Sequence, residues 1–373
     1  LDQIGGMQFL SDIHSDMHTS SNAKTYAKLI KELSLIRTLK FKLNDALKTV
    51  ETSLSYQDSV AQVSGILSEV EVKTESYKPF KEIVRGEVMS LDERFRNGGG
   101  FSGIKTGFDG LDETLQGLNG GDYFVIGARP SMGKTAFSLA LCKNMAKSDG
   151  DILYFSAEST KESLVNRIIT AASNVDSSII KSAKLSNEEW VRYHAGVSGI
   201  INLPLHIIDI AGIDISHAKA IASKFNRKKK IKAIFVDYIQ LMTCKNSKTE
   251  FEAVSNISRG LKAMAKENDC PVIALAQLSR GVEQRPDKRP VMSDLRSTGQ
   301  IEQDADFISF LYRDEYYDDD SYDKGITEFS IKKNREGETG KHFFQSDFSK
   351  MTYKEISYTE QPKKEAYKPF RGN

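Results

Sequence analysis

Two adjacent residues, Lys134 and Thr135, carry the clearest chemistry in the sequence. A loop between a strand and a helix can direct backbone N–H groups and the helix N-terminus at a phosphate group. A lysine there supplies positive charge to the outer phosphates, and a threonine hydroxyl can bind Mg²⁺. An apolar run precedes this loop and an amphipathic stretch follows it, so the segment is predicted to bind the phosphates of ATP or another NTP. The predicted contacts are Ala128, Arg129, Pro130, Ser131, Met132, Gly133, Lys134 and Thr135.

The loop departs from the usual phosphate-binding pattern at one position. The pattern G-x-x-x-x-G-K-S/T begins with glycine, whereas this chain has Ala128 there and Gly127 one residue earlier. Because the predicted strand and helix lie where the motif needs them, we interpret the segment as a nucleotide site rather than a chance G-K-T.

Polar side chains end three other apolar runs. Asp237 closes IKAIFVD and is predicted to organise the metal ion together with Thr135. Glu158 follows ILYFSA at the same expected edge of a parallel sheet, where ligands bind in such folds. It can activate the attacking water, or it can be an acid at the N-terminus of the next helix. Gln277 closes PVIALAQ, where it can sense the γ-phosphate or cap a turn.

These groups depend on an α/β fold to position them. Apolar runs without polar alternation are typical of strands buried on both faces, and helices between them indicate a mainly parallel sheet. Such runs occupy residues 123–128, 151–158, 203–210, 231–242, 271–277 and 306–313. The acidic run at 314–323 is interpreted as a solvated surface loop.

A helical region precedes this part of the chain. Residues 22–50 have apolar side chains at helical spacing, and residues 56–72 continue the pattern more weakly. Another amphipathic helix is predicted from Pro79 to the glycines at 98–100. Its apolar face either packs on its own domain or docks on a neighbouring subunit. The predicted divisions are a truncated helical domain (1–74), a linker helix with a glycine-rich hinge (75–100), an α/β domain (101–350) and a tail (351–373).

Composition excludes several classes of protein. The 373 residues include 52 basic and 51 acidic side chains, so a uniformly basic coat is excluded and nucleic acid must meet local positive surface. Three scattered cysteines argue against a disulfide framework and favour a reducing compartment. No apolar run is long enough to cross a membrane, and the first residues lack signal-peptide features. We therefore expect a cytoplasmic protein.

Six segments, taken in order, resemble the DnaB-type replicative helicase family between about residues 104 and 345. They are GARPSMGKT, FSAEST, FVDYIQLM, ALAQLSR, DLRSTGQIEQDADFISFLYR and KKNREGETG. The resemblance implies a RecA-like domain in a ring of six subunits that moves 5′ to 3′ on single-stranded DNA. It also implies a primase and a helicase loader as partners.

The resemblance assigns further site residues. Arg167 would lie beside the nucleotide base, and Gln277 would report on the γ-phosphate. Arg335, with Lys333, matches the family's finger, which reaches into the next subunit's site. Such an arginine contributes on the order of 10³–10⁵ in rate in other nucleotidases. Without the resemblance, Arg335 would be interpreted as an exposed surface arginine.

The DNA contacts are predicted in a basic, glycine-containing segment at 279–300. Basic loops with free backbone amides can follow a phosphate backbone without reading bases. Arg280 belongs to this segment, and Arg259 lies on the helix after Asp237. By resemblance, the contacts in the central channel are Arg296, Ser297 and Gly299. The basic run 227–230 directly precedes a buried strand and is interpreted as a solvated turn.

Three functions remain open from the residues alone. The first is a replicative helicase, and the second is a RecA-like recombinase or another DNA-dependent ATPase without unwinding. The third is a small-molecule or nucleoside kinase on the same scaffold, because a fold does not fix a function. A kinase would lack DNA-stimulated hydrolysis, and a recombinase would form open filaments.

Overall fold

The computed structural model describes residues 23–52, 59, 62–63, 66, 79–147, 150–245, 247–295 and 299–358. Its contacts divide the chain into two units, Leu1–Pro79 and Phe80–Asn373. The first unit contains the helix α2 (Ala23–Thr52), which matches the helix predicted over 22–50. The weaker helical prediction over 56–72 lies mostly outside the described residues.

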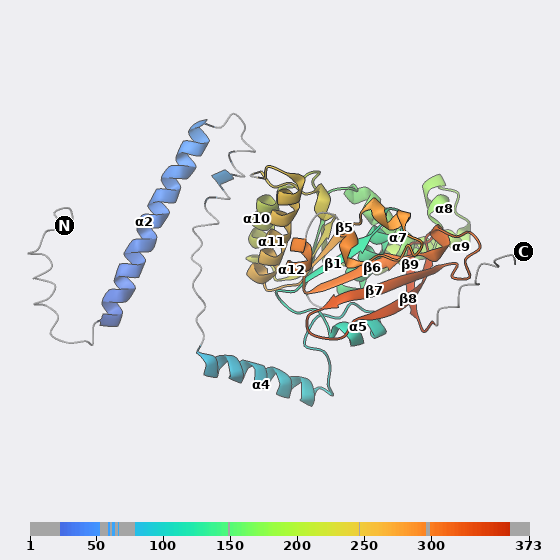
Figure 1. Cartoon of the computed structure of the whole chain (residues 1–373), viewed down its shortest axis with the longest axis horizontal. Coiled ribbons are helices and arrows are strands. Elements are labelled where there is room, and N and C mark those ends of the chain that lie inside the picture. The colour runs from blue at the N-terminus through green and yellow to red at the C-terminus, as the bar shows by residue number, and fades with distance from the viewer. Residues whose placement is uncertain are drawn as a thin grey trace, which may run out of the picture. The chain divides into compact units, whose positions relative to one another are not determined.

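The predicted linker helix is α4 (Phe80–Arg96), which starts directly after Pro79 (Figure 1). None of its residues is buried, and Phe80 and Phe95 are 81% and 79% exposed. The chain then turns through Gly98, Gly99 and Gly100, all with positive φ. Packing of this apolar face on its own domain is therefore not observed among the described residues.

The described residues of the second unit form a nine-stranded sheet with the order β3-β2-β4-β5-β1-β6-β7-β8-β9 (Figure 1). The first six strands in this order run parallel, and the last three extend the sheet antiparallel. The predicted α/β class with a mainly parallel sheet is confirmed. The parallel strands are β1 (Tyr123–Ala128), β2 (Asp151–Ser156), β3 (Leu205–Asp209), β4 (Ile231–Asp237), β5 (Val272–Gln277) and β6 (Phe307–Tyr312).

The antiparallel extension does not follow from the sequence patterns. It consists of β7 (Ile326–Asn334), β8 (Gly340–Asp347) and β9 (Thr352–Ile356). β9 lies beyond residue 350, so the sheet continues into the segment predicted to be a tail. The strand predicted over 231–242 is also too long, because the chain leaves the sheet at Asp237 and enters a 3₁₀ turn at Ile239–Leu241.

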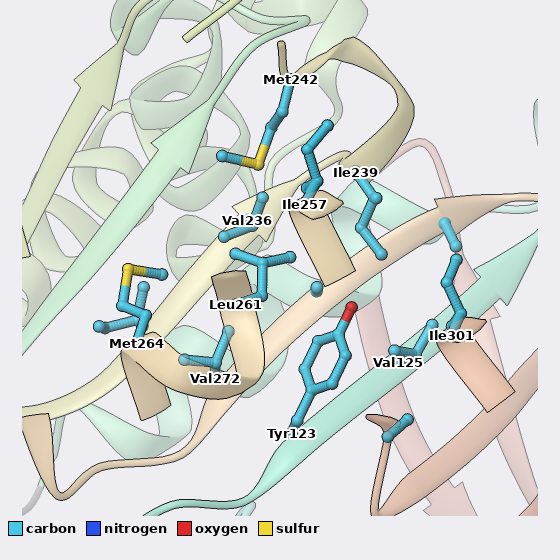
Figure 2. Packing of buried hydrophobic residues seen from close by; sticks show 14 of the residues in the cluster. Tyr123, Val125, Val236, Ile239, Met242, Ile257, Leu261, Met264, Val272 and Ile301 are labelled. Atoms are coloured by element: carbon cyan, nitrogen blue, oxygen red, sulfur yellow. The ribbon is translucent and has the colours of Figure 1, made fainter. Parts of the chain in front are cut away.

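Helices cover both faces of the sheet, and the pleat of β1 divides the core between them. Val125 belongs to one apolar cluster, which includes residues of α10, α11 and α12, and Figure 2 shows it between Tyr123 and Ile301. Phe124 belongs to the other cluster, with residues of α5, α6 and α7, because successive side chains of a strand face opposite ways. The helices are α5 (Asp109–Leu115), α6 (Lys134–Met145), α7 (Lys161–Ser173), α8 (Ser177–Ser182), α9 (Asn187–Ile200), α10 (Ile215–Asn226), α11 (Glu250–Asn268) and α12 (Gly299–Asp304).

None of the described helices is both long enough and apolar enough to span a bilayer.

Candidate active site

The predicted phosphate loop connects the end of β1 to the start of α6. Gly133, the residue before α6, has φ 89°, and Ser131 has φ 67°. A side chain at position 133 would be strained by this backbone conformation and would collide with Tyr353 and Phe348. Gly127 has a different role, because a Cβ there would lie 2.8 Å from Cδ1 of Phe310. The early glycine is thus explained by packing inside the sheet.

Residues from the antiparallel extension and from the segment after β6 form one wall of the loop. The Tyr353 hydroxyl donates a hydrogen bond to the Gly133 carbonyl at 3.0 Å. Arg313 donates from Nη1 to the Ser131 carbonyl at 3.1 Å, and its guanidinium lies 3.8 Å from the centre of the Phe348 ring. Sequence reasoning missed these residues, because no phosphate-binding motif includes them and they lie about 180 residues or more along the chain from the loop.

Thr135 and Asp237 meet as a metal-ligand pair would. The Thr135 hydroxyl donates to Asp237 Oδ2 at 2.8 Å, and the Tyr154 hydroxyl donates to the same oxygen at 3.3 Å. Asp237 is fully buried, and its Oδ1 has no hydrogen-bond partner among the described residues. A buried carboxylate oxygen beside a hydroxyl is a hard oxygen donor set. These residues therefore fit Mg²⁺.

The half-buried side chain of Lys134 places a positive charge at the loop. Burial lowers the pKa of its ammonium group, and the carboxylates of Asp237 and Glu158 partly oppose this by raising it. Its Nζ lies 3.8 Å from the centre of the Tyr238 ring. A poorly hydrated cation of this kind attracts a phosphate more strongly than a surface lysine does.

A pocket of about 410 Å³ brings the predicted nucleotide residues together. It joins the loop to Glu158, Arg167 and Gln277, which come from three different segments. The backbone of Gln277 is fixed by Gln240, whose side chain accepts from the Gln277 N–H at 3.0 Å and donates to its carbonyl at 3.1 Å. Glu158 is exposed to the pocket. The arrangement can hold a nucleotide and place a carboxylate near it.

Two loop side chains are held by contacts within the protein. Arg129 is only 8% exposed; it donates to the Leu278 carbonyl at 2.7 Å and forms a 2.7 Å ion pair with Glu283. Met132 is buried in the apolar cluster with Phe124. The backbone N–H groups of both residues remain able to bind phosphate, while their side chains stabilise the shape of the loop.

Arg335 and Lys333 lie at the opposite edge of the sheet from the loop. Arg335 Nη1 donates to Asp306 Oδ1 at 3.0 Å, and Lys333 Nζ donates to the carbonyls of Glu302 and Ala305. The end of β7 pairs with the start of β6, and the start of β6 pairs with Phe124 of β1. At about 3.3 Å per residue, the loop begins about 13 Å farther along β1. Neither basic residue lines the pocket.

The structure describes part of the predicted DNA surface. Arg296 and Ser297 lie outside the described residues, and Gly299 is the first residue of α12. Arg259 reaches the start of α12, with Nη2 3.4 Å from Gln300 Oε1. Arg280 is exposed, and the described residues offer it no hydrogen bond or ion pair.

Other basic residues of the same segment are paired. Arg285 binds Asp294 at 2.7 Å, and Arg289 binds Glu328 at 2.8 Å. The run 227–230 is exposed after α10, as predicted for a solvated turn, and its Lys229 lies 3.6 Å from Asp151.

Comparison with known proteins identifies the family. The model of the DnaB-like helicase C terminal domain matches residues 103–354. The chain belongs to the DnaB-like helicase family. Among curated relatives of this family, the replicative DNA helicase DnaC of Bacillus subtilis (strain 168) is 36% identical over 352 residues, which cover 91% of this chain and 76% of the relative. The replicative DNA helicase DnaB of Geobacillus stearothermophilus is 35% identical over 349 residues, with the same coverage of 91% and 76%.

Solved structures have the same fold. A DnaB-like replicative helicase, described with its interactions with primase, superposes with a TM-score of 0.78 at 33% identity, covering 95% of this chain and 84% of that one. A second solved structure, of an ATPase domain, gives a TM-score of 0.70 at 38% identity, covering 74% of this chain and 99% of that one. The predicted family and RecA-like fold are therefore confirmed.

Proposed function

We infer that this chain is a replicative DNA helicase that uses ATP hydrolysis to move 5′ to 3′ on single-stranded DNA and to unwind duplex at the replication fork. Relatives that carry the name replicative DNA helicase are 35–36% identical over 91% of the chain. The observation that carries the enzymatic part is the pocket at the end of β1, where the phosphate loop meets the carboxylate of Glu158 and where Thr135 binds the buried carboxylate of Asp237. Neither the recombinase nor the kinase alternative has an observation in its favour.

We propose a role for each residue of the pocket. The loop amides and Lys134 bind the phosphates, and Thr135 and Asp237 hold Mg²⁺, which neutralises phosphate charge when bound. Glu158 accepts a proton from the attacking water, and Gln277 contacts the γ-phosphate. Arg167 lines the pocket and is assigned to the nucleotide base.

We propose that Arg335 and Lys333 complete the pocket of a neighbouring subunit in a ring of six. Their position at the far end of β1 supports this, because they lie too far from their own phosphate loop to contact its nucleotide. The exposed apolar face of α4 would dock on a neighbouring subunit in the same ring. DNA would pass through the central channel against Arg296, Ser297, Gly299, Arg280 and Arg259.

We also propose the wider setting of this activity. The similarity to a helicase described with primase supports primase as a partner, and a loader is proposed with it. We retain the division into a helical domain, a linker and an ATPase domain at residues 74 and 100, with the ATPase domain extended to include β9. We place the reaction in the cytoplasm.

The test is strand displacement on a forked duplex, with ATP hydrolysis measured in the presence and absence of single-stranded DNA. We expect unwinding of forks that carry a free 5′ tail and hydrolysis that rises with DNA. Open filaments without strand displacement would instead indicate a recombinase. Hydrolysis that does not respond to DNA, with transfer of phosphate to a small acceptor, would indicate a kinase.

A further inference from the structure

Asp306 gathers three partners at the start of β6, away from the nucleotide pocket. Its Oδ1 accepts from Arg335 Nη1 at 3.0 Å, and its Oδ2 accepts from the Tyr123 backbone N–H at 2.9 Å. Lys262 of α11 donates to the same Oδ2. The Asp306 side chain is only 6% exposed, whereas that of Arg335 is 60% exposed. A fixed, buried carboxylate thus holds one end of a guanidinium that otherwise faces solvent.

We propose that Asp306 is a positioning residue for the Arg335 finger and acts, through that finger, on hydrolysis in the neighbouring subunit. This inference rests on the proposed function of Arg335. Asp306 does not line the nucleotide pocket of its own subunit, because it lies at the start of β6 while the phosphate loop follows the end of β1.

The surroundings of Asp306 make it a rigid support. Burial raises the pKa of its carboxyl, but the hydrogen bonds from Lys262 and Tyr123 outweigh burial and hold the pKa below its ordinary value. The Arg335 backbone N–H also donates to the Asp306 carbonyl at 3.0 Å. An arginine side chain loses rotamer entropy when it is ordered, so holding it before the reaction removes part of the ordering cost in the transition state.

Lys333 fixes the same hairpin at a second point. Its Nζ donates to the carbonyls of Glu302 and Ala305 at 2.6 and 2.7 Å, at the C-terminal end of α12. The end of β7 is therefore held at two points. Lys333 binds carbonyls at the end of α12, and Arg335 binds the carboxylate of Asp306. Loss of the carboxylate would free the guanidinium while leaving the strand in place.

The first experiment is the steady-state ATPase of the full chain carrying Asp306→Asn. Asparagine keeps the shape and an acceptor for Tyr123 but removes the charge that holds Arg335. We expect kcat to fall about tenfold or more, in the range of a lost oriented contact, while the KM for ATP stays near the wild-type value. If Asp306 only supported β1, the phosphate loop at the other end of that strand would be disturbed and KM would rise. A rise in KM with unchanged kcat would therefore overturn the proposal.

Mixed rings separate this inference from the proposed function. Lys134→Ala subunits lack a phosphate site but keep Asp306 and Arg335, so mixing them with Arg335→Ala subunits should restore hydrolysis at some interfaces. Mixing them with Asp306→Asn subunits should restore it likewise. Restoration with Arg335→Ala but not with Asp306→Asn would overturn the role of Asp306 and leave the finger intact. Restoration with neither, in verified mixed rings, would overturn the finger and the inference together.

Two controls address folding. Lys262→Met removes the other cation on Asp306 and keeps the Arg335 contact, so its kcat per folded subunit should stay within about twofold of wild type; a loss equal to that of Asp306→Asn would contradict the proposal. If Asp306→Asn unfolds below the assay temperature, Asp306→Glu keeps the charge but shifts the guanidinium. The mixed-ring readout then applies unchanged to Asp306→Glu.

Discussion

The charged groups at the two ends of β1 differ in whether they are paired within the protein. At its carboxyl end, Lys134 is half-buried without an ion pair among the described residues, and one oxygen of the buried Asp237 accepts no hydrogen bond from them. At its amino end, Asp306 binds Lys262, Arg335 and a backbone N–H together. The carboxyl end of β1 therefore has polar groups without partners among the described residues, and the amino end has charges that are already paired.

The difference indicates two ways to prepare a reaction. The groups around the phosphate loop are held in position without partners in the protein, so they can interact with a charged ligand when it binds, as in electrostatic preorganisation. The groups around Asp306 hold a flexible arginine in one position, which is preorganisation of a different kind. Loss of the Lys134 charge should therefore affect function, whereas loss of the Lys262 charge should affect stability.

The largest effect is expected for Lys134→Met. Hydrolysis should fall by at least about 10²-fold, since a charge that faces the phosphates is lost. The free energy of unfolding should rise by about 1 kcal/mol, because a poorly hydrated cation is replaced by an apolar side chain of similar length. ATPase assays and urea unfolding of the same preparation measure both. Retained activity would remove this loop from the active site.

The matched change at the other end, Lys262→Met, should have the reverse profile. It takes one partner from the buried Asp306, and we expect the free energy of unfolding to fall by about 2–4 kcal/mol. Hydrolysis per folded subunit should change little, because Lys262 contacts no residue of the pocket. An unchanged unfolding midpoint would show that the paired charges at this end do not stabilise the fold.

A smaller contrast is expected between two arginines of the DNA segment. Arg280→Ala should leave stability unchanged and weaken single-stranded DNA binding, with the salt slope reduced by about 0.7 for one lost phosphate contact. Arg285→Ala breaks the pair with Asp294 and should instead lower the free energy of unfolding by about 1 kcal/mol. Salt-dependent binding to oligonucleotides of different sequence checks the first result. A sequence-dependent loss would mean that Arg280 reads bases.

The smallest effect concerns Asp122, just before β1. Burial first, and then the nearby Asp306 and Glu336, raise the pKa of its carboxyl from 3.8 to about 6. The folded state thus binds a proton more tightly than the unfolded state, so the contribution of Asp122 to stability falls as pH rises from about 4 to about 6. Asp122→Asn should remove this loss and raise the free energy of unfolding by about 1 kcal/mol at pH 7, with little change at pH 4. Urea unfolding at both pH values tests it, and equal effects at the two would contradict it.

The parallel part of the sheet could be predicted from sequence because its strands are buried on both faces. Tyr123–Ala128 is continuously buried, and such runs stand out without any knowledge of their neighbours. The antiparallel part could not, because β8 mixes buried, partly buried and exposed positions and no clean period results. β9, which has no fully buried position, is hidden in sequence for the same reason.

Individual side chains were predictable where a motif fixes their backbone. The Thr135 hydroxyl binds Asp237, since Thr135 follows the loop after β1, Asp237 ends β4, and both lie at the carboxyl edge of one parallel sheet. Arg129 and Glu283 form an ion pair although they are 154 positions apart in the sequence, and no local sequence pattern predicts it. The role of Asp306 could not be predicted from the sequence for a related reason. It lies at the start of a strand, and carboxylates there belong to no nucleotide-binding motif.

If Arg335 is the finger that we propose, its position at the opposite end of β1 from the loop means that a complete site depends on how the subunits are connected. If each subunit gives its finger to one neighbour and receives one from the other, a closed circle of subunits contains as many working sites as subunits. The same subunits in an open arc contain one fewer, because the loop at one end meets no finger and the finger at the other end meets no loop. Opening a ring to admit DNA would therefore inactivate one site without altering any residue. The ATP turnover per subunit would then distinguish a closed ring from an open one.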